Sequence, residues 1–195
     1  PVELTGFPLY DQSDQVGLDP GLNDWLAAGE PPVVFTAGSA NVQAADDFAS
    51  AVSTSVDLGV RAVLATTNPD DVPDRLPTTV RHERYVPFSL LFPRARALVS
   101  NGGVGTCAQA LAAGIPHLVA HVNFDQRDNA SRLDDLGAGY GIPVKRFSGT
   151  RARQSLAELL DSVPAERTSE LSKRIDPESA RAQACEGIER TAARS

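Results

Sequence analysis

Short runs rich in β-branched residues alternate along this chain with longer amphipathic stretches. In the longer stretches apolar residues recur at helical spacing, as at Phe48, Val52 and Val56, and a glycine follows several of them. Alternation of this kind is typical of a parallel sheet with crossover helices, so the pattern predicts an α/β, Rossmann-like parallel sheet flanked by helices. The predicted strands are 33–36, 61–66, 80–86, 97–100 and 116–120, and the predicted helices of the core are 44–58, 105–113 and 126–136.

The length of the chain is sufficient for one buried core, because it has 195 residues of which 42% are hydrophobic. We therefore expect a single domain with three parts. These parts are a linker over 1–18, an α/β core over 19–150 and C-terminal helices over 151–195.

Both ends of the chain carry further signals. After the core, strand signals disappear, and Thr150 is predicted to cap a helix over 151–162, with another helix over 177–193. At the other end the chain starts abruptly and contains no Met. We therefore expect a domain cut from a longer protein.

The net charge and the positions of the two cysteines argue against several kinds of partner. The 18 Lys and Arg residues are outnumbered by 25 Asp and Glu, and the resulting net charge of -7 has the wrong sign for tracking a phosphate backbone. No apolar run approaches the ~20 residues that span a bilayer, so neither nucleic acid nor a transmembrane segment is expected. Cys107 and Cys185 lie too far apart for a metal-ligand spacing, and a reducing cytoplasm fits them.

The segment from Ser100 to Thr106 carries the most chemical information. It places Asn101, Gly102 and Gly103 directly after a predicted strand and at the start of a predicted helix. Bare amides at a helix N-terminus favour an anion such as a diphosphate. The glycine spacing matches neither the dinucleotide fingerprint nor the P-loop, and glycines that merely allow tight strand-to-helix packing explain the segment equally well.

Two further polar pairs follow predicted strands, at the same edge of the expected sheet. Ser39, after Gly38, has a hydroxyl that can donate to a phosphate, although a helix cap explains this pair better. Asp125 and Gln126 combine acceptors and donors suited to the vicinal hydroxyls of a sugar, and helix capping explains that pair equally well.

Taken together, these segments resemble the C-terminal, donor-binding half of the UDP-glycosyltransferase superfamily, whose members have the GT-B fold. The resemblance extends along most of the chain, and its motifs follow in the family's order. The similar segments are 5–8, 25–26, 31–39, 84–87, 91–94, 101–106, 110–116 and 125–133.

The resemblance implies roles at both ends of a nucleotide-sugar donor. Tyr85 takes the place of an aromatic residue that stacks on the nucleobase, and Val86 that of a residue whose backbone pairs with the base edge. Gln109 lies where many relatives carry Glu for the ribose hydroxyls, which leaves UDP and dTDP donors both open. Asp125 and Gln126 lie where the family grips the transferred sugar.

The resemblance also implies a diphosphate site between these ends. Asn101 lies where many relatives carry His, so less charge is available here for the leaving diphosphate, although a carboxamide can still donate. Besides Ser39 with its neighbour Gly38, the implied diphosphate ligands are the amides of Gly103, Val104, Gly105 and Thr106.

The implied function is the donor-binding half of an inverting, metal-independent glycosyltransferase without a cofactor. It would transfer a hexose from a UDP- or dTDP-sugar to a small or lipophilic acceptor. The family's base lies in an N-terminal acceptor domain, which is expected as a partner, so no catalytic residue is assigned here and this domain alone is expected to be inactive. His82, His117 and His121 are more typical of packed or capping imidazoles.

Two alternatives to a transferase stay open. The first is a noncatalytic sugar-nucleotide binding module, which Asn101 favours slightly. The second is a GT-B isomerase acting on a sugar nucleotide, which would need a base within the cleft, whereas the pair Asp125 and Gln126 favours transfer.

Overall fold

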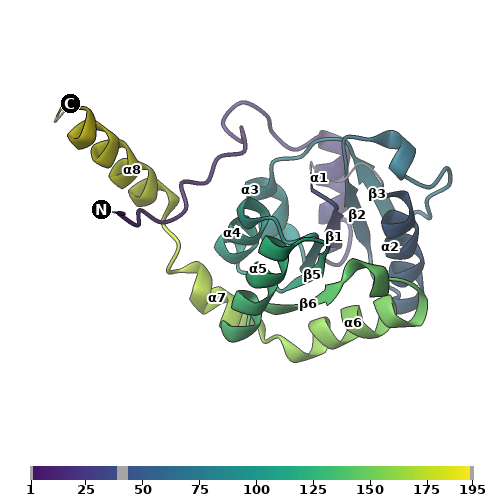
Figure 1. Ribbon diagram of the computed structural model, residues 1–195. Coiled ribbons are helices and arrows are strands. Elements are labelled where there is room, and N and C mark those ends of the chain that lie inside the picture. Colours follow the sequence, from purple (N-terminus) through teal and green to yellow (C-terminus); the bar gives the residue numbers. More distant parts are fainter. Residues whose placement is uncertain (1, 39–43, 194–195) are drawn as a thin grey trace.

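The computed structural model describes residues 2–38 and 44–193 of the chain and contains one parallel sheet covered by helices on both faces (Figure 1). Its strands are β1 (Val33–Thr36), β2 (Ala62–Ala65), β3 (Val80–Glu83), β4 (Ala97–Ser100), β5 (His117–His121) and β6 (Gly139–Pro143). Its helices are α1 (Pro20–Ala27), α2 (Ala45–Leu58), α3 (Phe88–Leu91), α4 (Val104–Ala113), α5 (Phe124–Asp135), α6 (Gly149–Ser162), α7 (Ala165–Ser172) and α8 (Pro177–Ala192). The predicted α/β class is thus confirmed.

The strand order is β3-β2-β1-β4-β5-β6, with parallel pairing throughout. The chain therefore runs outward from β1 in one direction, returns to the middle at β4, and runs outward in the other direction. Val33 illustrates this reversal, since it pairs with Ala62 of β2 on one side and with Ala97 of β4 on the other. Ligands of open parallel sheets bind at the carboxyl ends of the strands beside such a reversal.

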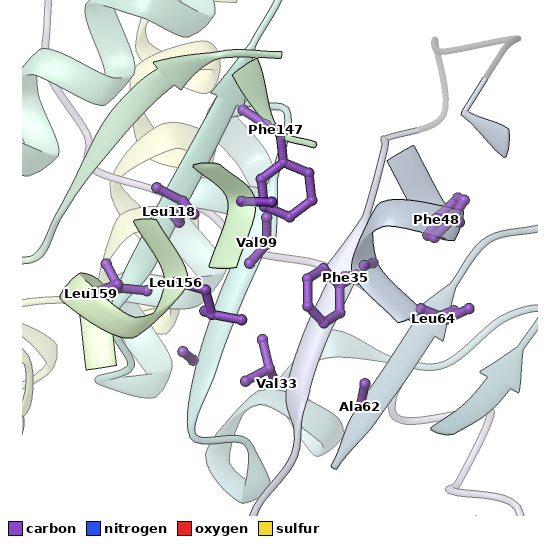
Figure 2. Packing of buried hydrophobic residues seen from close by; sticks show 14 of the residues in the cluster. Val33, Phe35, Phe48, Ala62, Leu64, Val99, Leu118, Phe147, Leu156 and Leu159 are labelled. Carbon is purple, nitrogen blue, oxygen red and sulfur yellow. The ribbon is translucent and has the colours of Figure 1, made fainter. Parts of the chain in front are cut away.

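Successive residues of the central strands face opposite sides of the sheet, so the core forms two layers. Val33 and Phe35 of β1 pack with α2 and α6, and Figure 2 shows them among Phe48 and Leu156 of those helices. The rings of Phe35 and Phe147 are 6.3 Å apart between centroids. The layer buries ten strand residues and seven others: Val33, Phe35, Ala62, Leu64, Val80, Ala97, Val99, Leu118, Ala120 and Ile142, with Ala44, Phe48, Ala51, Phe147, Ala152, Leu156 and Leu159.

The opposite face of the sheet is covered by the remaining helices of the body. Val34, between the two residues that face α2 and α6, packs against α1 and α4. Val119 of β5 packs against α4, α5 and α7. Because both faces are buried, the central strands are apolar at nearly every position, as expected for a parallel sheet.

Helix α8 extends away from this body, and the N-terminal segment runs beside it (Figure 1). The two are joined by an ion pair of 2.9 Å between Arg190 and Glu3. Along the described ranges, no helix has the length and apolar character needed to cross a membrane.

Strand β6 was not predicted, because its sequence contains Gly139, Gly141 and Pro143, which are poor strand formers. The structure gives a tertiary reason for the glycines. A Cβ on Gly139 would lie 1.9 Å from the carbonyl oxygen of His117, and a Cβ on Gly141 would lie 2.5 Å from the Cβ of Ala130. Close packing against β5 and α5 has therefore overridden local strand preference.

Three predicted boundaries differ from the observed ones by two residues or more. The prediction that Thr150 caps a helix is wrong, because α6 begins at Gly149 and its N-cap is Ser148. The strand predicted to end at Val86 ends at Glu83, before the chain turns toward α3. Helix α5 begins at Phe124, two residues before the predicted start.

Candidate functional site

The loops that leave β1, β4 and β5 meet at the carboxyl edge of the sheet. Gly38 has φ +73, and a Cβ there would lie 2.7 Å from Nδ2 of Asn101. A Cβ on Gly102 would lie 3.3 Å from the backbone oxygen of Gln126, and Asn129 donates its Nδ2 to the Gly102 carbonyl at 2.9 Å. Three segments predicted from sequence are therefore in contact.

A cavity of about 690 Å³ lies at the same edge, on the side of β2 and β3. Pockets for small ligands typically have volumes of ≈ 300–1,000 Å³. Four predicted site residues line the cavity: Gly38, Tyr85, Val86 and Gln109. The other lining residues are Tyr10, Asp11, Gln12, Thr36, Ala37, Ala65, Thr66, Thr67, Asn68, Asp71, Arg84 and Phe88.

Tyr85 and Val86 are neighbours in sequence and both line this cavity. The Tyr85 side chain is an exposed large hydrophobic group, with 52% of the residue accessible, and its hydroxyl donates to the backbone oxygen of Asp11 at 2.7 Å. Val86 is buried and packs with Phe88 on the α3 side. An aromatic ring held at its far end while much of its surface stays accessible can stack on a flat ligand.

The glycine-rich segment places unpaired amides at the start of α4. Gly103 is the N-cap with φ -58, and its own N–H donates to Oδ1 of Asn101 at 3.3 Å. Within the described part of the chain, the amides of Val104, Gly105 and Thr106 have no acceptor. Such first-turn amides, with the helix dipole, favour an anion.

Asp125 and Gln126, at the start of α5, differ in their hydrogen bonds and in their exposure. Oε1 of Gln126 accepts from the backbone N–H groups of Val122 at 2.8 Å and Asn123 at 3.1 Å, so Gln126 caps this turn and is buried. Asp125 is exposed in the first turn, and no hydrogen-bond partner for its carboxylate occurs in residues 2–38 and 44–193. Capping thus accounts for Gln126, whereas Asp125 is exposed to solvent.

A buried pair beneath the loop fixes its shape. Ser100 Oγ lies 2.8 Å from Nε2 of His117 and accepts from the Gly102 N–H at 3.0 Å. His117 is fully buried, and its Nδ1 has no partner among the described atoms. The prediction that His117 is a packed imidazole is confirmed, and His82 caps a loop through its 2.9 Å contact with the carbonyl of Thr66.

We expect His117 to make the fold sensitive to acid. Burial lowers the pKa of His117 from 6.5 to about 3, so between these values the unfolded chain binds a proton that the folded chain does not. Stability is therefore complete above pH 6.5 and falls as the pH drops toward 3, by up to ~1.4 kcal/mol per pH unit. Between pH 7 and pH 5 the wild type should lose about 2 kcal/mol more than His117→Gln in urea titrations. Parallel losses in the two proteins would contradict a buried neutral imidazole.

The structure does not gather every predicted residue around one cavity. Asn101 lines a smaller pocket with Thr36 and Asp47, and neither pocket is lined by residues 104–106 or by Asp125. Ser39 lies outside the described residues. No three His, Cys, Asp or Glu side chains in the described ranges are arranged to hold a metal ion.

Two parts of the cavity lining were not predicted from the sequence. One is the end of β2 with the loop that follows it, Ala65 to Asn68, and the other is the linker segment Tyr10 to Gln12. The loop after β2 could have been found, since its strand neighbours β1 and all carboxyl ends share one edge. The linker segment carries no such signal, because it reaches the cavity through contacts with residues more than 70 positions away.

Comparison with known proteins places these features in a family. Residues 49–186 match the family described as "Erythromycin biosynthesis protein CIII-like, C-terminal domain". An uncharacterized glycosyltransferase of Mycobacterium leprae is 34% identical over 69% of this chain and 32% of its own length. O-mycaminosyltylonolide 6-deoxyallosyltransferase of Streptomyces fradiae is 30% identical over 95% of this chain and 44% of its own. The chain thus spans less than half the length of either relative.

Solved structures of glycosyltransferases share the fold. The calicheamicin glycosyltransferase CalG4 superposes with a TM-score of 0.74 at 23% identity, over 92% of this chain and 46% of its own. The glycosyltransferase VinC, in complex with dTDP, has a TM-score of 0.68 at 26% identity, over 88% of this chain and 44% of its own. The resemblance to the C-terminal half of GT-B glycosyltransferases is confirmed, and the chain belongs to the erythromycin biosynthesis protein CIII-like C-terminal domain family.

Proposed function

We propose that this chain binds the nucleotide-diphosphate-sugar donor of a glycosyltransferase. The observation that carries the proposal is the order of the candidate groups along the sheet edge. Tyr85 and Val86 follow β3, the unpaired amides follow β4, and Asp125 follows β5. Four strand intervals of about 4.8 Å separate β3 from β5, or roughly 19 Å in all. The order of these groups along the sheet edge is the order of the parts of the donor. The aromatic residue corresponds to the base, the unpaired amides to the diphosphate and the carboxylate to the sugar.

In this arrangement Tyr85 stacks on the base and the backbone of Val86 pairs with its edge. The ribose lies near Gln109, which lines the cavity from α4. The diphosphate accepts from the amides of Val104, Gly105 and Thr106, and Asp125 accepts from hydroxyls of the sugar. Gln126 supports the last contact, because its capping of the turn fixes the start of α5.

The transferase chemistry that this site would serve is inverting and metal-independent. As the bond to the diphosphate breaks, negative charge develops on the leaving group. Preorganised amides at a helix N-terminus stabilise such charge without a cation. Asn101 adds a carboxamide N–H, since its Oδ1 is engaged by Gly103 and its Nδ2 faces Gly38. We assign the base that deprotonates the acceptor to an N-terminal acceptor domain and no catalytic residue to this chain.

The names of the relatives favour a deoxysugar donor and a natural-product acceptor. The Streptomyces fradiae relative is named as a transferase of a 6-deoxyallosyl group to O-mycaminosyltylonolide, and VinC is described in complex with dTDP. By analogy we propose a hexose as the transferred group and a small or lipophilic acceptor. The location is proposed to be cytoplasmic.

Calorimetric titration tests the proposal directly. The chain should bind UDP or dTDP, and the corresponding sugar nucleotide more tightly than the bare diphosphate. If neither diphosphate nor any sugar nucleotide binds, the proposed function is wrong.

Asp125 provides the discriminating variant. Losing one partner of a buried hydrogen bond costs about 1 to 3 kcal/mol, so Asp125→Ala should weaken a sugar nucleotide roughly 5- to 150-fold. Affinity for the bare nucleoside diphosphate should change little, because that ligand does not reach Asp125. Asp135→Ala is the matched control, since it removes an exposed carboxylate from the far end of the same helix. Equal losses for both ligands in Asp125→Ala would instead make Asp125 a structural residue.

A further inference from the structure

The linker segment Tyr10, Asp11 and Gln12 contributes three of the residues that line the cavity. It precedes α1 and belongs to no helix or strand. Figure 1 shows the N-terminal part of the chain running past α3 before it enters α1. We call these three residues the strap.

Asp11 joins the strap to the residues after β3 by three hydrogen bonds. Its Oδ2 accepts from the Ser89 N–H at 2.6 Å, and its Oδ1 accepts from the Ser89 hydroxyl at 3.1 Å. Its backbone oxygen accepts from the Tyr85 hydroxyl at 2.7 Å. One residue of the linker therefore contacts both the ring that we assign to the base and the short helix α3.

The backbone of the strap is itself held in an uncommon conformation. Gln12 has φ 57, and it is the one residue other than glycine with positive φ among those that the structure describes. Its carbonyl accepts from the N–H groups of Gln15 and Val16, each at 2.9 Å. A strained residue persists where its surroundings over-determine it, and such residues cluster at ligand sites.

The contact with Tyr85 matters because the ring is largely accessible. A side chain that is immobilised before the ligand arrives loses less freedom on binding, which raises affinity. The Asp11 carbonyl immobilises the Tyr85 hydroxyl, and the Asp11 carboxylate fixes Ser89, four residues further on. The platform is thus preorganised by a segment outside the α/β core.

We propose that Asp11 is a positioning residue of the donor site, through which the linker sets the affinity for the nucleobase end of the donor. The proposal rests on the proposed function, because it takes Tyr85 as the base platform. It adds that the strap, and not the core alone, forms the nucleotide pocket.

The test compares Asp11→Ala with Asp14→Ala in the same chain. Asp14 is a matched control, since it is an exposed carboxylate three residues away with no hydrogen bond in the described structure. Asp11→Ala removes the two carboxylate bonds to Ser89 and keeps the backbone oxygen that accepts from Tyr85, so it acts by releasing the strap from the residues after β3. It should weaken UDP and dTDP about tenfold, because the released strap no longer holds Tyr85 in place. Inorganic pyrophosphate, titrated as a competitor of UDP, should keep its affinity because it carries no base, and Asp14→Ala should bind every ligand as the wild type does.

Two further measurements separate positioning from a general effect on folding. Hydrogen exchange without ligand should speed up at the Ser89 amide in Asp11→Ala and stay unchanged in Asp14→Ala. Tyr85→Phe, which keeps the ring and removes only the strap contact, should weaken UDP in the same direction, and it serves as the test if Asp11→Ala does not fold.

Each outcome decides the proposal. A folded Asp11→Ala with wild-type affinity for UDP overturns it, and so does an equal loss for UDP and pyrophosphate, which would make Asp11 a purely structural residue. Failure of the proposed function has a different signature, because the wild type would then bind neither UDP nor dTDP.

Discussion

Replacing Gly103 by valine should abolish measurable binding of UDP and dTDP while the chain stays folded. The backbone tolerates the change, because Gly103 has φ -58 and the nearest atom to an added Cβ is Oδ1 of Asn101 at 3.7 Å. The valine methyl groups would instead occupy the space in front of the α4 amides. Two or three lost hydrogen bonds to a charged ligand should reduce affinity roughly 100-fold or more.

Calorimetry with UDP and dTDP, accompanied by circular dichroism, checks this expectation. Gly17→Val is the matched control, since Gly17 is exposed, lies outside the cavity, and has no atom within 4 Å of an added Cβ. If Gly103→Val is folded and binds UDP as tightly as the wild type, the diphosphate lies elsewhere and the α4 amides are not its ligands.

The neighbouring glycine should behave in the opposite way. Gly102 has φ +85, and an added Cβ would lie 2.4 Å from Cγ1 of Val119, which is fully buried in β5. Left-handed backbone and overpacking together should destabilise Gly102→Ala by roughly 2–5 kcal/mol. Urea denaturation measures this loss, with Gly103→Ala as the control because its added Cβ makes only ordinary contact.

Substitutions at the two adjacent glycines therefore have different expected effects: at Gly102 the stability falls, and at Gly103 the binding of UDP and dTDP is lost. A stability loss in Gly102→Ala below about 1 kcal/mol would show that Val119 and the loop adjust easily. In that case the buried contacts of Ser100 with His117 and Gly102 would not fix the conformation of the glycine-rich loop. The conformation of the proposed anion site would then depend on other contacts.

The parts of the fold that the sequence predicts are those whose local signal agrees with their tertiary surroundings. The strand predicted over 33–36 is observed at Val33–Thr36, since a buried parallel strand is a short apolar run. Strand β6 has the opposite character, because contacts with His117 and Ala130 require glycines that local propensity disfavours. Its existence follows from packing that no window of sequence contains.

The sequence likewise predicts some parts of the candidate site and not others. The glycine-rich turn and the start of α5 could be predicted, because each follows a strand and all the strands share a carboxyl edge. The division of roles between Asp125 and Gln126 could not, since both are typical of a helix start and only hydrogen-bond geometry distinguishes them. The strap could not be predicted either, because Asp11 reaches Ser89 across 78 positions of sequence.

The reversal of strand order between β1 and β4 also bears on how such a site can diversify. Residues up to Phe92 supply the strap, β1 to β3 and the proposed base platform, whereas residues from Ala97 onward supply the proposed anion and sugar contacts. Recognition of the nucleobase and recognition of the transferred sugar are therefore proposed for separate stretches of the chain, although Gln109 of the second stretch lines the same cavity as Tyr85. A single recombination event between relatives, within the stretch that encodes residues 93–96, would exchange the strap and the proposed base platform together and leave the proposed sugar contact with its original parent.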